Sequence, residues 1–212
     1  MKQLKTGTGK HESQLGFRVI LGAMGAVGTL VRLYYMRKAS GSGQISRRRE
    51  ERLRFALLAS CNALGMIGGL VYVLAPERMK WATLPLPTWS RWLGVGLGAV
   101  GGPLLLWTHQ ALGKNWSATV EIKGEHTLVT SGPYRWVRHP MYTTFFVQGL
   151  ASLLVSANWV IGGSWLGQGI VAASRAGDEE ALMIEEFGDR YRAYMQRTGR
   201  FLPPVKIRAY VT

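Results

Sequence analysis

The residues best able to do chemistry are concentrated in one segment, HTLVTSGPYRWVRHPMY, which spans residues 126–142. The segment is dense in side chains that make directional hydrogen bonds, and Ser131-Gly132-Pro133 has the composition of a turn. Pro140 suits the first turn of a following helix, where its missing N–H costs nothing. We therefore expect His139 to lie at a helix N-terminus, pointing into a polar interface and not into the packed core.

A second charged segment begins at Arg175. Arg175 and Glu179 are four residues apart, so on a helix they lie on one face and can pair or share a ligand. Further acidic residues follow on the same helix, and we expect Glu185, Glu186 and Asp189 to face solvent.

Other chemistries have little support. The histidines (His11, His109, His126 and His139) have no short ligand spacing, so we expect no metal site. The single cysteine, Cys61, lies in an apolar run, where a packing role fits better than a catalytic thiol. The net charge of +14 could suggest nucleic acid, but the basic residues flank apolar runs and form no reader motif. Anionic lipid headgroups explain this charge more simply.

Charged residues are crowded into a few segments, and the blocks between them suit a membrane. Four nearly uncharged blocks run over residues 15–36, 55–75, about 89–112 and 141–174. The last is too long for one span, and Ser156-Ala157-Asn158 near its centre predicts a turn between two short helices. We expect an all-α polytopic membrane protein with about five transmembrane helices, the last two a helical hairpin, followed by a cytosolic C-terminal helix.

Glycines at helical spacing in two of these blocks favour close packing of membrane helices over a nucleotide-binding loop. They are Gly22, Gly25 and Gly28 in the first block and Gly94, Gly98 and Gly102 in the third.

The distribution of lysine and arginine predicts the orientation. With five spans, eighteen basic residues fall on one side and seven on the other. Because cytosolic loops carry the excess of positive charge, we expect the N-terminus outside and the C-terminus in the cytosol. We divide the chain into residues 1–84, with the N-terminal tail and two helices, and residues 85–212, with the third helix, the polar motif, the hairpin and the C-terminal helix. Together they form one integral membrane domain.

The two polar segments, with an uncharged hairpin between them and FGDRYRAYMQRTGRFLP after them, resemble the isoprenylcysteine carboxyl methyltransferase family, which is similar to the phospholipid N-methyltransferases. The resemblance covers about residues 85–204. It implies a pocket for S-adenosyl-L-methionine on the cytosolic side. One departure is Thr143, where the family commonly has a small residue.

When the family's functional residues are matched to this sequence by position, the resemblance implies roles for individual residues. Arg175 and Glu179 are the expected catalytic residues, Arg175 on the side of the methyl acceptor and Glu179 touching the cofactor or holding Arg175. The expected cofactor-binding residues are His126, Leu128, Val129, Tyr134, His139, Pro140, Met141, Tyr142 and Glu179.

The sequence therefore predicts methyl transfer from S-adenosyl-L-methionine to a lipophilic acceptor that enters from the bilayer, with the carboxylate of a prenylcysteine-like substrate preferred. No nucleic acid or metal partner is expected. Amine phospholipids and thiols are alternative acceptors. Membrane sterol reductases, which bind NADPH, also resemble the C-terminal region, but the R-x-x-x-E-E helix favours the methyltransferase. A non-catalytic scaffold is disfavoured, because polar residues at the membrane boundary are costly without a ligand.

Overall fold

The computed structural model describes residues 2–38, 49–113 and 127–204, and over these residues the chain is helical and contains no β-strand. The all-α fold class is confirmed. The helices are α1 (Lys2–Lys38), α2 (Arg49–Leu74), η1 (Pro76–Ala82), α3 (Thr88–Leu112), η3 (Gly132–Arg135), α4 (Pro140–Ser156), α5 (Trp159–Ala173), α6 (Ala176–Phe187) and α7 (Asp189–Arg197).

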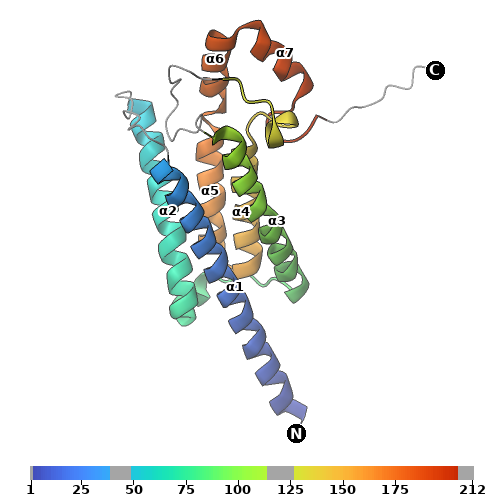
Figure 1. Ribbon diagram of the computed structural model, residues 1–212. Helices are drawn as coiled ribbons and strands as arrows, with labels where there is room; N and C mark the ends of the chain where they lie inside the picture. Colours follow the sequence, from blue (N-terminus) through green and yellow to red (C-terminus); the bar gives the residue numbers. More distant parts are fainter. Residues whose placement is uncertain (1, 39–48, 114–126, 205–212) are drawn as a thin grey trace, which may run out of the picture.

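The long helices form a bundle, and the two short C-terminal helices lie over one end of it (Figure 1). Helix α4 is central, packing on both α3 and α5, and α5 packs in turn on α2. Helix α1 crosses the bundle obliquely, in contact with α2, α3 and α4, and its N-terminal end extends beyond the other helices. This arrangement places the connections into α4 and out of α5 at the same end, beneath α6 and α7.

The turn between α4 and α5 is built by two residues, Ala157 and Asn158. Ala157 has a left-handed backbone with φ of 48°, which ends α4. The buried Asn158 caps α5 by accepting hydrogen bonds from the backbone N–H groups of Val160 and Ile161 at 3.1 and 3.2 Å. Its amide nitrogen donates to the carbonyl of Met79 at 3.2 Å, so the same side chain also fixes η1.

A buried arginine ties the helices together at this end of the bundle. Arg91 of α3 donates through Nε to the carbonyl of Val155, at 3.0 Å, near the end of α4. Its Nη1 donates to Gln14 of α1 at 2.7 Å and its Nη2 to Tyr72 of α2 at 2.9 Å. The guanidinium also lies 4.0 Å from the centre of the Phe17 ring. One side chain therefore contacts three neighbouring helices, and its donors satisfy a carbonyl that ends a helix.

The predicted role of the glycines in helix packing is confirmed at three of the six positions. A Cβ on Gly94 would lie 2.8 Å from the backbone nitrogen of Val155, and one on Gly98 would lie 2.5 Å from Met24. Gly22 also faces a neighbouring helix, 3.6 Å from Val73. The interpretation is wrong for the remaining three, which have open space around them; these are Gly25, Gly28 and Gly102.

Two helices are long and apolar enough to cross a bilayer, α1 over Gln14–Arg37 and α2 over Arg52–Leu74. Only 11% of the first apolar window and 17% of the second are buried inside the bundle. Large apolar side chains such as Leu30 and Ile67 are more than half exposed, which suits contact with lipid. Helices α4 and α5, at 17 and 15 residues, are shorter than the ~20 residues of an untilted span. The count of five spans therefore stays a prediction.

Two helix boundaries differ from the predicted ones. The expected single C-terminal helix is two helices, because Gly188 has φ of 53° and this left-handed backbone ends α6 before α7 begins. The first helix begins at Lys2, well before the apolar block at residue 15. Hydropathy marks only the part of a helix that suits lipid, so the polar N-terminal extension gave no signal.

Candidate active site

The segment that leads into α4 is paired with the segment that follows α7. The backbone N–H of Gly199 donates to the carbonyl of Trp136 at 3.0 Å, and the N–H of Arg138 donates to the carbonyl of Gly199 at 2.8 Å. The N–H of His139 then donates to the carbonyl of Arg200 at 3.0 Å. These bonds hold the C-terminal motif against the start of α4, so residues about 60 positions apart in sequence share one site.

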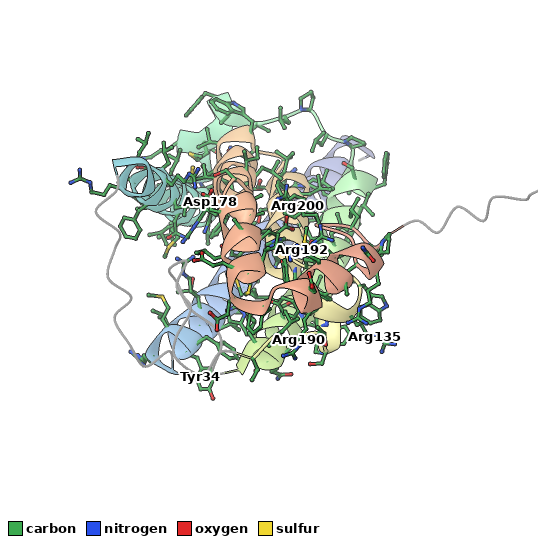
Figure 2. All side chains as sticks on the ribbon, turned by 90° about the horizontal axis from the view of Figure 1, so that it is seen from above. Tyr34, Arg135, Asp178, Arg190, Arg192 and Arg200 are labelled. Carbon is green, nitrogen blue, oxygen red and sulfur yellow. The ribbon has the colours of Figure 1, made fainter. Side chains whose placement is uncertain are left out.

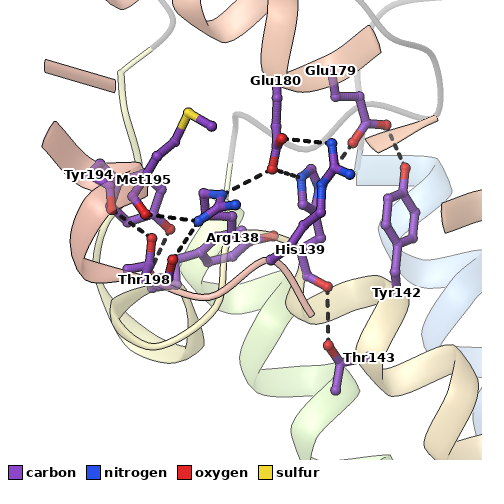
Figure 3. A network of polar contacts seen from close by, with 11 residues as sticks. Arg138, His139, Tyr142, Thr143, Glu179, Glu180, Tyr194, Met195 and Thr198 are labelled. Atoms are coloured by element: carbon purple, nitrogen blue, oxygen red, sulfur yellow. Dashed lines mark hydrogen bonds and ion pairs between the residues drawn. The ribbon is translucent and has the colours of Figure 1, made fainter. Parts of the chain in front are cut away.

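His139 is the N-cap residue of α4, as predicted, but its side chain is buried. Its Nδ1 lies 3.3 Å from Oε2 of Glu179, and its Nε2 lies 3.1 Å from Oε1 of Glu180 (Figure 3). The ring is stacked on Tyr142, with centroids 5.5 Å apart and an angle of 9° between the planes. The expectation that His139 is clear of the packed interior is wrong, because α6 folds over it and supplies both carboxylates.

Glu180 is the centre of a buried ion-pair network (Figure 3). Its Oε1 accepts from Nε of Arg138 at 3.0 Å and its Oε2 from Nη2 of Arg200 at 2.7 Å. Burial by itself raises the pKa of Glu180, but hydrogen bonds from Arg200, Arg138 and His139 outweigh it and hold that pKa below its ordinary value of 4.5. Arg138 also donates to the carbonyls of Met195 and Thr198, which anchors the network to α7.

Glu179 faces a different group of side chains. The hydroxyl of Tyr142 donates to its Oε1 at 2.5 Å, and His139 lies against its other oxygen. Pairing of Glu179 with Arg175, one of the two possibilities that their spacing allowed, is not observed among the described residues, because α4 presents Tyr142 and His139 to this carboxylate instead. Arg175 is half-buried at the N-cap of α6, close enough to Tyr142 to act on its hydroxyl electrostatically.

Tyr134 joins the same cluster from η3. It is buried, and its carbonyl accepts from the hydroxyl of Tyr194 at 2.6 Å. Burial, followed by the proximity of Tyr194 and Glu179, raises the pKa of Tyr134 well above its ordinary value. Tyr134 therefore stays protonated across the neutral range and can act as a hydrogen-bond donor.

The structure gives a position for most of the remaining predicted cofactor-binding residues, but not for all of them. Pro140 and Met141 form the first turn of α4 directly after His139, Pro140 buried and Met141 half-buried. Leu128 and Val129 are half-buried in the segment before η3. No hydrogen bond from either is seen among the described residues. His126 lies outside the described residues.

Sequence reasoning assigned no role to Glu180, Arg138 or Arg200, which form the ion-pair network. Each was visible as a charge within a recognised motif, but single charges in a polar segment are usually solvated. No local spacing signals their pairing, because the three residues lie in separate segments of the sequence that only the fold brings together. The prediction that Glu185, Glu186 and Asp189 face solvent is confirmed, because all three are exposed.

Thr143, the departure from the family pattern, has a defined contact. Its Oγ1 donates to the carbonyl of Phe201 at 2.6 Å. The Phe201 ring lies 5.9 Å from that of His139 and 6.4 Å from that of Tyr142, centroid to centroid. The hydroxyl thus fastens the end of the C-terminal motif over the two aromatic rings, a contact that a small apolar residue at this position would lack.

The cluster can hold a ligand that carries positive charge. Glu179 retains 27% exposure of its side chain, whereas Glu180 retains 8%, so Glu179 is the carboxylate that a ligand can reach. The faces of Tyr142 and His139 lie beside it, and aromatic faces attract cations. Among the described residues of the cluster no serine or cysteine is paired with a base, so the arrangement favours binding and orientation over covalent catalysis.

Comparison with known proteins identifies a family that this site resembles. Residues 94–185 match the model of the isoprenylcysteine carboxyl methyltransferase family. This segment is therefore similar to that family. The match confirms the resemblance and includes both polar segments up to α6, together with the α4–α5 pair between them.

The chain is also similar to named members of the family. It is 32% identical over 133 residues to a human protein-S-isoprenylcysteine O-methyltransferase, a stretch that covers 61% of this chain and 47% of that relative. Over 83 residues it is 35% identical to the enzyme of the same name from Schizosaccharomyces pombe, covering 37% of this chain and 34% of that relative. The chain therefore spans about half or less of the relatives it matches.

The fold has a solved counterpart. A eukaryotic intramembrane Ras methyltransferase, described as an isoprenylcysteine carboxyl methyltransferase, superposes with a TM-score of 0.54 at 20% sequence identity. The superposition covers 87% of this chain and 66% of that one. The likeness extends to helices outside residues 94–185, so the bundle as a whole has this fold.

Proposed function

We propose that the chain is a methyltransferase that uses S-adenosyl-L-methionine and acts on a lipophilic acceptor, preferably the carboxylate of a prenylcysteine-like substrate. The observation that carries the proposal is the cluster of buried His139 and Tyr142 with the partly exposed Glu179 at the end of an apolar bundle, inside the segment of the family match. The names of the similar proteins support the acceptor class.

The chemistry of the cluster fits this donor. S-adenosyl-L-methionine carries a sulfonium and an amino group, and Glu179 with the adjacent aromatic faces offers a negative charge and π-systems to receive positive charge. When bound, it supplies an activated methyl group. We assign its binding to Glu179, Tyr134, His139, Pro140, Met141 and Tyr142, together with His126, Leu128 and Val129 on the preceding segment.

The protein's own part in the reaction is alignment and exclusion of water. Methyl transfer is an in-line displacement in which positive charge is lost, so holding the two reactants in line in a dry site favours it. Glu180 and its arginines contribute by fixing His139 and α6 in place. No covalent nucleophile from the chain is needed.

Arg175 is proposed to hold the acceptor. A guanidinium can donate two parallel hydrogen bonds to the two oxygens of a carboxylate and so fix its orientation. One of these oxygens keeps a lone pair for attack on the methyl group. Arg175 lies where α5 ends and α6 begins, at the boundary between the apolar bundle and the polar cap. An acceptor with a lipid tail could therefore leave its tail in the bilayer and present its carboxylate here. We place this boundary and the C-terminus on the cytosolic side, following the distribution of basic residues.

A comparison of two ligands tests the class of enzyme. The purified full chain in lipid nanodiscs is titrated with S-adenosylhomocysteine and, separately, with NADPH. We expect binding of S-adenosylhomocysteine alone, and binding of NADPH alone would assign the chain to the reductase class. A transfer assay with labelled donor across prenylcysteine, phosphatidylethanolamine and thiol acceptors then identifies the acceptor class.

A further inference from the structure

An ion pair joins α2 to the first turn of α6, three residues after Arg175. Nη1 of Arg54, near the start of α2, lies 2.5 Å from Oδ2 of Asp178 in the first turn of α6. Figure 2 shows Asp178 on the side of the cap nearest α2. The partners are 124 positions apart in sequence, and Arg54 lies outside the segment of the family match.

Asp178 has a second possible partner, which it does not use. Asp178 and Arg175 are three residues apart, and Arg175 already has helical backbone angles, φ of −83° and ψ of −13°. Side chains at this spacing are neighbours on the helix surface, so an arginine and an aspartate there can pair. Instead Asp178 pairs with Arg54, and among the described residues the guanidinium of Arg175 makes no hydrogen bond or ion pair.

The side chains around Arg175 leave its guanidinium without a competing carboxylate. Glu179, the other acidic neighbour, is bonded to Tyr142 and His139. Asp178 is 63% exposed and Arg54 30% exposed, so their pair adds little to the stability of the fold. The pair instead determines whether Asp178 is bonded to Arg54 or to Arg175.

We infer that Arg54 is a positioning residue that engages Asp178 and thereby leaves Arg175 available for the carboxylate of the acceptor. The inference rests on the proposed function, and it gives α2 a part in acceptor specificity. Without Arg54, Asp178 turns to Arg175 and competes with the acceptor as an internal carboxylate. The donor side of the site, which lies at Glu179 and His139, is unaffected.

The test compares Arg54→Gln, Arg54→Lys and the double variant Arg54→Gln/Asp178→Asn with the wild-type full chain in nanodiscs. The probe acceptor is an N-acetylated prenylcysteine. Arg54→Gln should raise the KM for this acceptor about threefold to fivefold, the effect that a partly exposed pair can have, with the affinity for S-adenosylhomocysteine unchanged. Arg54→Lys keeps a cation for Asp178 and should resemble the wild type, and the double variant should restore the KM.

A second readout does not depend on catalysis. Phenylglyoxal modifies free arginines, and its reaction with Arg175 can be followed by peptide mass spectrometry. Arg175 should react more slowly in Arg54→Gln and recover its rate in the double variant. The matched control is Arg192→Gln, which breaks an exposed ion pair within α7, 2.9 Å to Asp189, and should change neither readout.

The outcomes separate this inference from the proposed function. A wild-type KM and wild-type Arg175 reactivity in Arg54→Gln would overturn the inference, provided that the wild type methylates the probe. Slower reaction of Arg175 with an unchanged KM would also overturn it, since the pairing would then have no effect on the acceptor. A wild type that methylates no carboxylate contradicts the proposed acceptor itself.

Discussion

Glu179 and Glu180 are neighbours in sequence with different surroundings. On α6 they point in directions about 100° apart, so Glu180 lies among Arg138, His139 and Arg200 while Glu179 faces Tyr142. A buried carboxylate that accepts several charge-assisted hydrogen bonds is costly to leave without them. We therefore assign Glu180 to holding the site together and Glu179 to the ligand.

His139 connects these two roles, and its removal should affect both. His139→Ala should weaken binding of S-adenosylhomocysteine about tenfold or more, the effect of one or two lost hydrogen bonds in a dry site. Because the ring is buried against Glu180, the unfolding temperature should fall as well. Calorimetric titration and thermal unfolding measure the two effects, with the exposed Glu185→Gln as control. Unchanged affinity in a folded His139→Ala protein would remove His139 from the site.

The depressed pKa of Glu180 predicts an acid-sensitive fold. A carboxylate with a folded pKa below its unfolded value of about 4.5 stabilises the protein above that pH, and the stabilisation is lost as the pH falls through the folded pKa. The unfolding temperature of the wild type should thus drop between about pH 5 and about pH 3. Glu180→Gln should be less stable near neutral pH and should lose this part of the dependence. Parallel pH curves for the two proteins would contradict the assignment.

At the scale of the elements, the turn between α4 and α5 depends on one side chain. Asn158→Ala removes the cap of α5 and the bond to Met79, and we expect a loss of about 1–3 kcal/mol in unfolding free energy. Chemical denaturation in detergent measures it. Ser174→Ala is the control, because it removes only an exposed hydroxyl bonded to the carbonyl of Val171. Equal stability of Asn158→Ala and the control would show that the cap is dispensable.

The elements also show why the sequence predicted some features and missed others. The break at Ser156-Ala157-Asn158 was predictable because helix termination and capping are local properties of the chain. The pairing of residues 136–139 with 199–200 was not, because it joins segments that four helices separate in the sequence. Glu180 was missed for the same reason. Its role depends on Arg138 and Arg200, which only the folded chain brings together.

At the scale of the whole molecule, the account depends on which side of the membrane α6 and α7 occupy. If basic residues mark the cytosolic side, a reporter fused after Thr212 should report cytosol, and one fused ahead of Met1 should report the opposite side. Both polar segments lie at the same end of the bundle as the C-terminal helices (Figure 1), so the C-terminal reporter also shows on which side of the membrane the candidate active site lies. A C-terminal reporter outside the cytosol would contradict the orientation and the count of five spans together.

The measurement that most directly tests the central claim is the chemical nature of the methylated product. Purified full chain is incubated with labelled S-adenosyl-L-methionine and an N-acetylated prenylcysteine, and the product is treated with alkali. A methyl ester releases its label as methanol, whereas methylated amines and thioethers retain it. We predict alkali-labile label that depends on the enzyme and falls about tenfold or more in Arg175→Lys, because lysine offers a point charge where arginine offers a fixed fork. Label that is stable to alkali on a different acceptor, or equal rates for the wild type and Arg175→Lys, would contradict the claim that this protein methylates a carboxylate held by Arg175.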